Sequence, residues 1–408
     1  MKLSKIKNAI QRAVINAVCV IIDAIGFIFI KQQMQVDDKE NVLIIRPDAI
    51  GDFVVWSNSA STYLQLYPPE TYKIVLLGNE NCEEIALKSG FFDVFIPFDR
   101  IKFMLNWGYR FEKWKLLTTS NYHTIIYPTY SREFATGDLV VNRLNAQHKI
   151  GIASDTAIDS RLWTNISNAF YTKLYKLPNE NGHELLKNEV FINQLGLKDF
   201  KASIPDLAYC SSEANILDLN NDIAQKRVKY FVIFPGARVG IRQWSAEKFA
   251  EIADYIFENT GWKGVLLGSS SESEICENVL KCAQKAILMN LAGKTSLLET
   301  IDLIGKANFF IGNETSGIHI AIAQNTPSLC IVGGGHFGRF MPYPAHLLAQ
   351  NNTISAIAIY KMPCFNCDWN CIYKIDKNTA APCVENISVE IVKVEIDIIL
   401  KKIQEAVR

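Results

Sequence analysis

A loop in the second half of the chain combines glycine with basic side chains in a pattern that suits a diphosphate. It covers residues 234–244 (FPGARVGIRQW), follows an apolar run and leads into a helical pattern. Gly236 allows close backbone approach, the start of the helix offers N–H groups to an anion, and Arg238 and Arg242 add cationic donors. The pattern predicts a diphosphate-binding loop; an ordinary strand-to-helix loop with solvated arginines is the alternative.

A second loop, residues 312–319 (GNETSGIH), also lies where an apolar run ends and a helix begins. Thr315 or Ser316 can cap that helix, and their hydroxyl and backbone N–H groups can bind phosphate. The Glu314 carboxylate can accept hydrogen bonds from sugar or ribose hydroxyls. His319 lies one turn into the helix, where its side chain either contacts a bound ligand or packs in the core.

A third segment, residues 46–52 (RPDAIGD), is in the first half of the chain. Gly51 permits a tight strand-to-helix turn, which would place Asp52 at a helix start facing a cleft. A carboxylate in that position can act as general base on an acceptor hydroxyl. The alternative is an aspartate that caps the helix.

Four of the ten cysteines are clustered near the C-terminus with the spacing C-x2-C-x3-C-x11-C. Tetrahedral zinc binding, a small core of buried thiols, and disulfide or redox chemistry are all compatible with this spacing. The other six are scattered singly, which is typical of reduced thiols. The clustered residues are Cys364, Cys367, Cys371 and Cys383.

The elements that position these loops alternate between short apolar runs and helical patterns, which predicts an α/β fold with parallel sheets covered by helices on both faces. In such sheets ligands bind beyond the carboxyl ends of the strands, where the first three segments lie. A helix is expected over residues 53–67. Strands are expected near residues 42–45, 74–77, 94–96, 124–127, 230–234, 264–267, 309–312 and 328–332.

Polar residues without a strand pattern separate two such series, so the chain divides into two domains. A helix should open at Ser245 and end at Gly261, and Ser296 with Glu299 forms a capping box for another. The expected organisation is an N-terminal apolar helix (1–36), a first domain (37–206), a linker (207–228), a second domain with the Cys-rich segment 364–383 (229–385), and a C-terminal helix (386–408).

Composition excludes several classes of protein. The 408 residues are 49% hydrophobic and 21% charged, as in a globular protein, and 42 basic residues balance 42 acidic ones. A net charge of zero gives no basis for nucleic-acid binding. The chain has no Asp-x-Asp metal clamp, no GxGxxG with a downstream acidic partner, and no GxSxG motif, which argues against metal-dependent single-domain transferases, dehydrogenases and α/β-hydrolases.

The N-terminus carries basic residues before an apolar stretch, residues 13–30, which Asn16 and Asp23 interrupt. Asn16 and Asp23 are seven residues apart and share a helix face. The stretch can lie in the membrane surface with that face polar, span the membrane, or pack on its own protein. In the first two cases the basic flank would be cytoplasmic.

These segments together resemble glycosyltransferase family 9, the lipopolysaccharide heptosyltransferase family. Segments 45–52, 234–244, 291–297 and 312–321 match its pattern in order, and the resemblance covers roughly residues 41–345. It implies the GT-B fold, two Rossmann-like domains facing a central cleft, with the acceptor at the first domain and the donor at the second. It also implies an inverting transfer that needs no metal at the diphosphate.

The resemblance assigns roles to individual residues. Asp52 would be the catalytic base, with Arg46 and Gly51 on the acceptor side, and Arg242 would contact the donor phosphates. Glu314 stands where the family commonly has aspartate, and Arg242 stands where the family often has lysine. These two departures bear on the identity of the donor sugar more than on the class of reaction. The residues implied on the donor side are Gly236, Arg238, Arg242, Lys294, Asn313, Glu314, Thr315, Ser316, Gly317 and His319.

The implied function is transfer of a sugar, heptose in the family, from a nucleotide-diphosphate donor such as ADP-heptose to a cell-envelope glycan or glycolipid. No cofactor is expected for catalysis, and a structural zinc is the only metal that the cysteines suggest. The expected location is the cytoplasmic face of the inner membrane, peripheral or N-terminally anchored. The alternatives are a GT-B epimerase or hydrolase, and a non-catalytic membrane-attached sugar-nucleotide-binding subunit.

Overall fold

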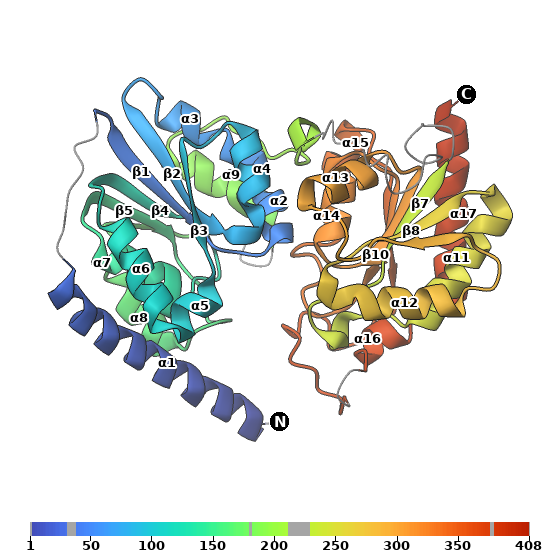
Figure 1. The fold of residues 1–408 in the computed structure, drawn as a ribbon, viewed down its shortest axis with the longest axis horizontal. Helices are drawn as coiled ribbons and strands as arrows, with labels where there is room; N and C mark the ends of the chain where they lie inside the picture. The colour runs from blue at the N-terminus through green and yellow to red at the C-terminus, as the bar shows by residue number, and fades with distance from the viewer. Residues whose placement is uncertain (1, 31–37, 179–181, 211–228, 376–378, 408) are drawn as a thin grey trace. The chain divides into compact units, whose positions relative to one another are not determined.

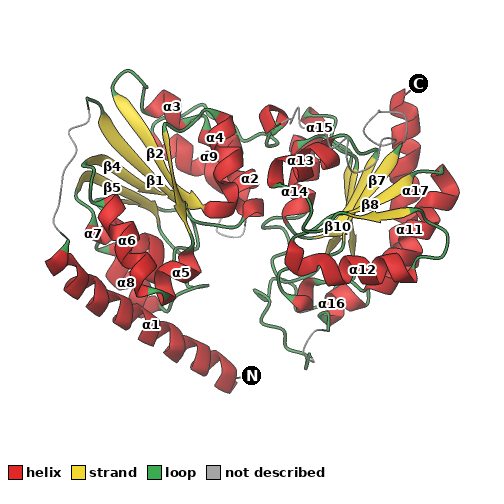
Figure 2. Cartoon of the chain, viewed as in Figure 1, coloured by secondary structure: helices red, strands yellow, loops and turns green. Residues whose placement is uncertain are grey.

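The computed structural model describes residues 2–30, 38–178, 182–210, 229–375 and 379–407. The chain forms two compact units, each built on one six-stranded parallel sheet covered by helices (Figures 1 and 2). Unit 1 contains residues 1–53, 59–180 and 186–202, and unit 2 contains residues 54–58, 181–185 and 203–408. Two parallel α/β sheets and an apolar N-terminal helix confirm the predicted fold class.

The sheet of unit 1 has the strand order β3-β2-β1-β4-β5-β6, and every pair is parallel. Its strands are β1 (Glu40–Arg46), β2 (Tyr72–Asn79), β3 (Val94–Phe98), β4 (Tyr122–Tyr127), β5 (Ala146–Ile152) and β6 (Lys173–Tyr175). The helical elements of the first half of the chain are α1 (Lys2–Phe29), α2 (Ile50–Ala60), α3 (Tyr63–Leu66), η1 (Glu80–Cys82), α4 (Glu83–Ser89), α5 (Arg100–Leu105), α6 (Trp107–Leu117), η2 (Phe134–Asp138), α7 (Leu139–Arg143), α8 (Arg161–Asn168) and α9 (Glu184–Leu195).

The sheet of unit 2 has the strand order β12-β11-β10-β7-β8-β9, again parallel throughout. Its strands are β7 (Tyr230–Phe234), β8 (Lys263–Leu266), β9 (Leu288–Asn290), β10 (Phe309–Asn313), β11 (Ser328–Val332) and β12 (Ser355–Ile359). The other elements are η3 (Ala208–Cys210), η5 (Gly240–Arg242), α11 (Ala246–Thr260), η6 (Ser270–Glu272), α12 (Ser273–Cys282), α13 (Leu297–Gly305), α14 (Ser316–Ala323), α15 (Ala345–Gln350), α16 (Pro382–Glu385) and α17 (Val389–Val407).

Local sequence explains most of these boundaries. All five residues of β7, β10 and β11 are buried, as expected of strands covered on both faces. The Ser245 side chain accepts a hydrogen bond from the Lys248 backbone, and Gly261 ends α11 in the left-handed conformation that glycine adopts readily. The predicted capping box of Ser296 and Glu299 is present at α13.

The helix expected over residues 53–67 is wrong in its bounds, because two helices replace it. α2 begins at Ile50 and ends at Ala60, and α3 begins at Tyr63. The Thr62 hydroxyl donates to the Ser59 carbonyl at 2.6 Å, where a continuous helix would need that group for its own ladder. The predicted linker, residues 207–228, lies outside the described residues from 211 onward.

Helix α1 packs on unit 1 through its polar side. Asn16 and Asp23 are 0% and 1% exposed, so they do share a face, and that face points into the protein. Asp23 receives two hydrogen bonds from the Arg110 guanidinium, each 2.6 Å long, and a third from the Trp114 indole. Of the three interpretations of this segment, packing on its own protein is therefore observed.

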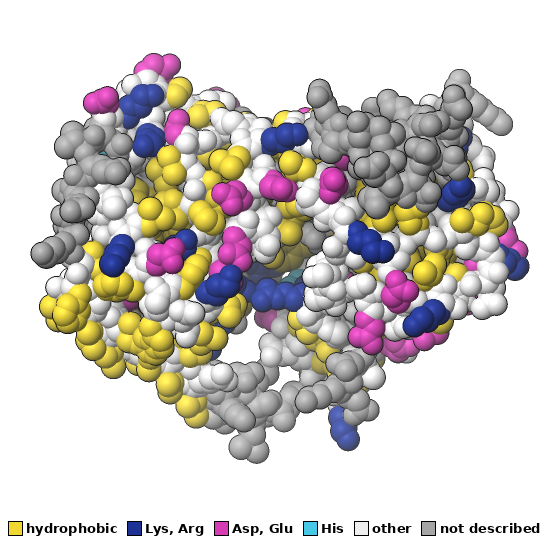
Figure 3. All heavy atoms as spheres, in the orientation of Figure 1, with side chains coloured by type: hydrophobic (Ala, Val, Ile, Leu, Met, Phe, Trp, Pro, Cys, Tyr) yellow, Lys and Arg dark blue, Asp and Glu magenta, His cyan; other side chains and the backbone are white. Residues whose placement is uncertain are grey.

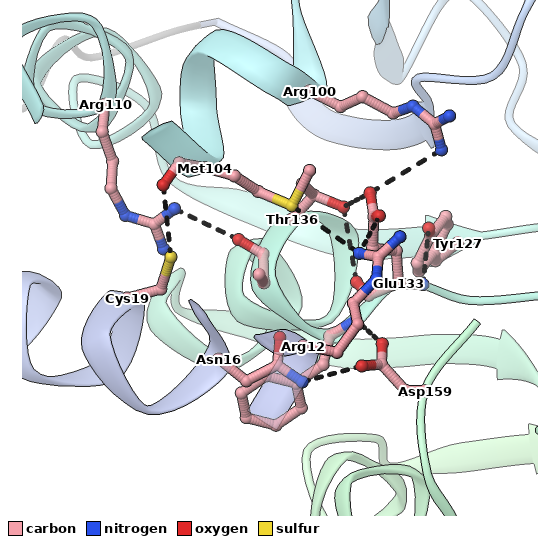
Figure 4. A network of polar contacts seen from close by, with 12 residues as sticks. Arg12, Asn16, Cys19, Arg100, Met104, Arg110, Tyr127, Glu133, Thr136 and Asp159 are labelled. Atoms are coloured by element: carbon pink, nitrogen blue, oxygen red, sulfur yellow. Dashed lines mark hydrogen bonds and ion pairs between the residues drawn. The ribbon is translucent and has the colours of Figure 1, made fainter. Parts of the chain in front are cut away.

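Further polar contacts hold the first half of α1 (Figure 4). The Asn16 amide donates to Asp159 at 2.7 Å, and Arg12 donates to Glu133 at 2.6 Å. Arg110 is 2% exposed and also donates to backbone carbonyls of the same unit. In the described part of the chain, Ala9–Phe29 is the helix segment long and apolar enough to cross a membrane by length and composition.

We expect Asp23→Ala to lower the free energy of unfolding of unit 1 by about 3–5 kcal/mol, because it leaves the buried Arg110 charge unpaired. Chemical denaturation followed by circular dichroism measures this, and adding Arg110→Met should recover part of the loss. Replacing the exposed Asp397 on α17 by alanine is the matched control and should change the free energy by less than about 1 kcal/mol. Unchanged stability in Asp23→Ala would show that α1 does not depend on this ion pair.

Candidate functional site

The pairing of β10 with β7 brings two of the predicted loops together in unit 2. The strands are parallel neighbours with Gly312 opposite Phe234, so their carboxyl ends meet at one edge of the sheet. Asn313, fully buried, donates from its amide to the Pro235 carbonyl at 2.7 Å and accepts from the Trp244 backbone at 3.1 Å. This one side chain fixes the path of the loop that carries Arg242.

Arg242 reaches from the turn η5 to the end of β10. Its guanidinium donates to the Glu314 carbonyl at 2.5 Å and lies 3.9 Å from the Glu314 carboxylate. It also stacks over the Trp369 ring at 5.2 Å from the ring centre. Arg242 and Glu314, which the sequence placed on the donor side for separate reasons, therefore form one cluster.

Trp369 is a member of this cluster that the sequence analysis did not assign to it. Its ring lies against Gly333 and Gly335 just after β11, where an added Cβ would come within 2.3 Å of the indole. Asn366, Asp368 and Trp369 all have left-handed φ angles, between 50° and 64°. Such strain in a tryptophan persists only where packing enforces it, and it is common at ligand sites. In the sequence, the three consecutive glycines at 333–335 are the feature that could have indicated a close approach by a large side chain.

The cluster contains buried polar atoms that lack hydrogen-bond partners among the described residues. These are both carboxylate oxygens of Glu314, the Nε of Arg242 and the indole nitrogen of Trp369. Buried polar groups in folded proteins are normally hydrogen-bonded. Their gathering at the carboxyl edge of a parallel sheet, beside a helix N-terminus, indicates a site for a polar ligand.

Burial changes the charge state of Glu314 and His319. Burial raises the pKa of Glu314 to about 7, and the nearby Arg242 cation only partly opposes this shift. Burial lowers the pKa of His319 to about 3, and the neighbouring His183 and Arg242 add to the effect. His319 is 4% exposed and hydrogen-bonded to the Tyr343 hydroxyl at 3.1 Å, so it is a packed, neutral histidine in this structure.

The start of α14 differs from the expected cap. Thr315 occupies the N-cap position, but its side chain makes no capping hydrogen bond and contacts only the Asn313 carbonyl, at 3.4 Å. The prediction that the Thr315 side chain caps the helix is therefore wrong, although Thr315 does hold the N-cap position, and both Thr315 and Ser316 are partly exposed. Gly317 lies so close to Phe234 and Phe310 that a Cβ there would be 2.9 Å from each ring.

The other residues predicted on the donor side lie outside the cluster of Arg242, Glu314 and Trp369. Arg238 is exposed. Lys294 follows β9, two strands away from β7, and donates to the Asn290 carbonyl at 2.9 Å. A Cβ on Gly236 would lie 2.4 Å from the Glu272 carboxylate, so this position accepts only glycine without a shift of that side chain.

The residues predicted on the acceptor side lie in unit 1, at and just after the end of β1. Arg46 is 4% exposed; it pairs with Asp48 at 3.1 Å and donates to the Pro128 carbonyl at 2.9 Å. Arg46 therefore shapes the loop. Asp52 is partly exposed in the first turn of α2, whose N-cap is Ala49, so Asp52 is not the N-cap residue. Gly51 lies inside the helix without a left-handed φ, so the predicted tight turn at Gly51 is wrong.

The clustered cysteines line the loop that carries Trp369. Burial raises the pKa of Cys383, and the thiols of Cys364, Cys367 and Cys371 are close enough to add to that shift. All four thiols are free. In the described chain, no three His, Cys, Asp or Glu side chains are arranged to hold a metal ion, so zinc binding stays a prediction.

Comparison with known proteins adds to this geometry. Residues 114–371, more than half of the chain, match Glycosyltransferase family 9 (heptosyltransferase). Lipopolysaccharide heptosyltransferase 3 of Escherichia coli (strain K12) is 26% identical over 308 residues, which are 73% of this chain and 84% of that protein.

Solved structures of other proteins share the fold. A glycosyl transferase family 9 protein from Veillonella parvula DSM 2008 aligns with a TM-score of 0.67 at 17% identity, over 90% of this chain and 99% of that chain. E. coli heptosyltransferase WaaC with ADP-2-deoxy-2-fluoro heptose aligns with a TM-score of 0.62 at 16% identity, over 88% of this chain and 99% of that chain.

The raised pKa of Glu314 predicts a pH dependence of stability. The unfolded chain releases this proton near the ordinary glutamate pKa of 4.5, whereas the folded protein holds it to about pH 7. The folded state therefore binds more protons in this window, and Glu314 lowers the unfolding free energy as pH rises through it, by on the order of 3 kcal/mol.

His319 has the opposite slope below about pH 6.5, because its folded pKa is depressed. The comparison of Glu314→Gln with wild type cancels that contribution. We expect the variant to gain stability relative to wild type between about pH 4.5 and 7, measured by chemical denaturation at a series of pH values. A constant difference between the two proteins would show that Glu314 ionises normally.

Proposed function

Because the chain belongs to glycosyltransferase family 9 and is therefore a glycosyltransferase, we propose that it transfers heptose from ADP-heptose, or a closely related nucleotide-diphosphate sugar, to a glycolipid of the cell envelope. The relatives named for lipopolysaccharide core heptose transfer support lipopolysaccharide as the acceptor class. The cytoplasmic face of the inner membrane is the location where such a donor and acceptor meet. In this proposal, the residues that carry the reaction lie in segments 45–52, 234–244 and 312–321.

The observation that carries the donor assignment is the set of unpartnered polar atoms on Arg242, Glu314 and Trp369. A nucleotide-diphosphate sugar supplies the complementary groups. Its phosphate oxygens accept from Arg242, and its hydroxyls donate to the Glu314 carboxyl. The Arg242 cation and the N–H groups at the start of α14 stabilise the charge that develops on the leaving diphosphate, so the proposal needs no metal there.

On the acceptor side, Asp52 takes the proton from the attacking hydroxyl. That oxygen forms the new bond to the anomeric carbon on the face opposite the diphosphate as the old bond breaks, which inverts the configuration. Arg46 holds the first turn of α2, which carries Asp52: its guanidinium contacts the Asp52 carbonyl at 3.4 Å and the Thr129 hydroxyl at 3.1 Å. Lys294, Asn313, Thr315, Ser316 and Gly317 complete the donor side as proposed.

We expect Asp52→Ala to keep nucleotide binding and to lose about 10²–10⁴-fold in turnover, the range that a positioned general base supplies. The measurement is transfer from ADP-heptose to a heptose-deficient glycolipid, with product analysis of the donor alone to detect hydrolysis. Asp52→Asn, which keeps the shape of the side chain, should be equally impaired. Transfer at the wild-type rate by either variant would remove Asp52 as the base.

Arg242→Ala should abolish stabilisation by the matching nucleotide. A ligand at about 100 times its dissociation constant adds about 2.7 kcal/mol of stability, which a thermal unfolding series with ADP, GDP, UDP and CMP would detect. Lys285→Ala removes an exposed cation that pairs with Glu258 and is the matched control. If Arg242→Ala responds to the nucleotide as wild type does, the phosphate site lies elsewhere.

A further inference from the structure

The outer face of α1 is an apolar stripe that the protein leaves uncovered. Its members are between 36% and 78% exposed, and they recur every three or four residues, so they follow one side of the helix. The stripe is about 30 Å long at 1.5 Å per residue. We refer to it as the outer stripe: Ile10, Val14, Val18, Ile21, Ile25, Ile28 and Phe29.

An ordinary surface helix hides its apolar side and exposes its polar side. Helix α1 instead buries its polar residues, together with Cys19, and exposes a row of apolar ones. Here Arg12 and Asn16 turn inward to partners on unit 1 (Figure 4). Asp23 turns inward as well, and the side facing outward is hydrophobic (Figure 3). Soluble monomers rarely expose a continuous apolar surface of this size unless something binds it.

Neighbouring elements extend the apolar surface. An apolar groove of about 350 Å³ lies between α1 and α6, with Ile22, Ile25, Gly26, Trp107 and Phe111 in its lining. Trp107 is 51% exposed and Leu105, just before it, is 61% exposed. Helix α8, whose Trp163 packs in the same cluster as Cys19, exposes Leu162 and Ile166 as well.

We propose that this surface docks unit 1 on an anionic lipid bilayer, with α1 lying in the plane of the membrane and the outer stripe among the acyl chains. Between residues 13 and 30 the only charged residue is Asp23, which is buried, so the stripe carries no charge. The sequence places Lys2, Lys5 and Lys7 before it and Lys31 after it, which suits anionic head groups. Trp107 at the groove matches the preference of tryptophan for the membrane interface.

The polar contacts favour an in-plane helix over a spanning one. To cross the bilayer, α1 would have to leave Arg110, Glu133 and Asp159 and carry Asp23 into the hydrocarbon. That step would strip Arg110, 2% exposed, of its ion-pair partner while it remains inside unit 1. An in-plane helix keeps every one of these contacts and still buries the outer stripe.

Docking would have a consequence for the acceptor. Unit 1 carries Asp52 and the loop held by Arg46 as well as α1. If Asp52 is the base, as in the proposed function, membrane docking of this unit brings the base to the surface that holds a glycolipid acceptor. The docking itself does not depend on that function, since it involves a surface without proposed catalytic residues.

The test is co-sedimentation of the full chain with vesicles of phosphatidylethanolamine and phosphatidylglycerol, beside vesicles of phosphatidylcholine. We expect wild type to bind the anionic vesicles more tightly, and Val14→Glu/Ile21→Glu/Ile25→Glu to bind them at least tenfold more weakly. Circular dichroism and the nucleotide-dependent thermal shift should stay unchanged in that variant. The matched control is Val394→Glu/Ile398→Glu, which alters two exposed apolar residues of α17 in unit 2 and should bind as wild type does.

Three outcomes would overturn the proposal. Equal vesicle binding by wild type and the triple variant would remove the outer stripe as the contact. Equal loss in the α17 control would show a non-specific effect of added charge. A wild-type dimer that ignores vesicles and becomes monomeric in the triple variant would identify the stripe as an interface between two copies of the chain.

The orientation has its own measurement. Lipids brominated near the head group should quench the fluorescence of Trp107 more than lipids brominated near the chain end, with Trp107→Phe supplying the background of the other tryptophans. Stronger quenching by the deep bromines would contradict the in-plane orientation. This readout requires no catalytic activity, so its failure and the failure of the proposed function are distinguishable.

Discussion

The cluster of Arg242, Glu314 and Trp369 depends on the parallel pairing of β10 with β7. Asn313, at the end of β10, makes hydrogen bonds with its buried amide to the loop that follows β7. These bonds fix the position of Trp244 and of the turn that carries Arg242. Arg242 and Glu314 are far apart in the chain. The strand pairing and the Asn313 contacts are what hold the Arg242 guanidinium next to Glu314. The site is a product of strand order first and of side-chain chemistry second.

That geometry leaves Arg242 oriented before any ligand arrives. The Glu314 carbonyl holds one end of the guanidinium and the Trp369 ring lies over its face, while the Nε remains without a partner in the described chain. A cation that is already aligned loses little freedom when an anion binds, which is the physical basis of electrostatic preorganisation. The raised pKa of Glu314 fits the same environment, since burial away from water penalises an ionised carboxylate.

The sequence predicted the features that depend on local patterns. Strand positions, the Ser245 and Ser296 caps and the family segments follow from apolar runs, capping residues and short motifs, and the structure places them accordingly. Trp369 escaped prediction because its role arises from packing against Gly333 and Gly335, thirty-odd residues away. Gly51 was assigned a turn that the helix start at Ile50 does not need, because motif spacing does not reveal where a helix begins.

Helix α1 shows the same limit in another form. Periodicity correctly placed Asn16 and Asp23 on one face of the helix. It does not determine whether that face points into the protein or away from it, because this depends on the residues that the face contacts. The partners are Asp159 and Arg110, more than eighty residues further along the chain, so the sequence of the helix itself does not predict them. Once Arg110 is buried beside Asp23, the polar face must point inward and the apolar face must point outward. A composition that passes for a membrane span thus becomes a surface helix through one buried ion pair and its neighbours.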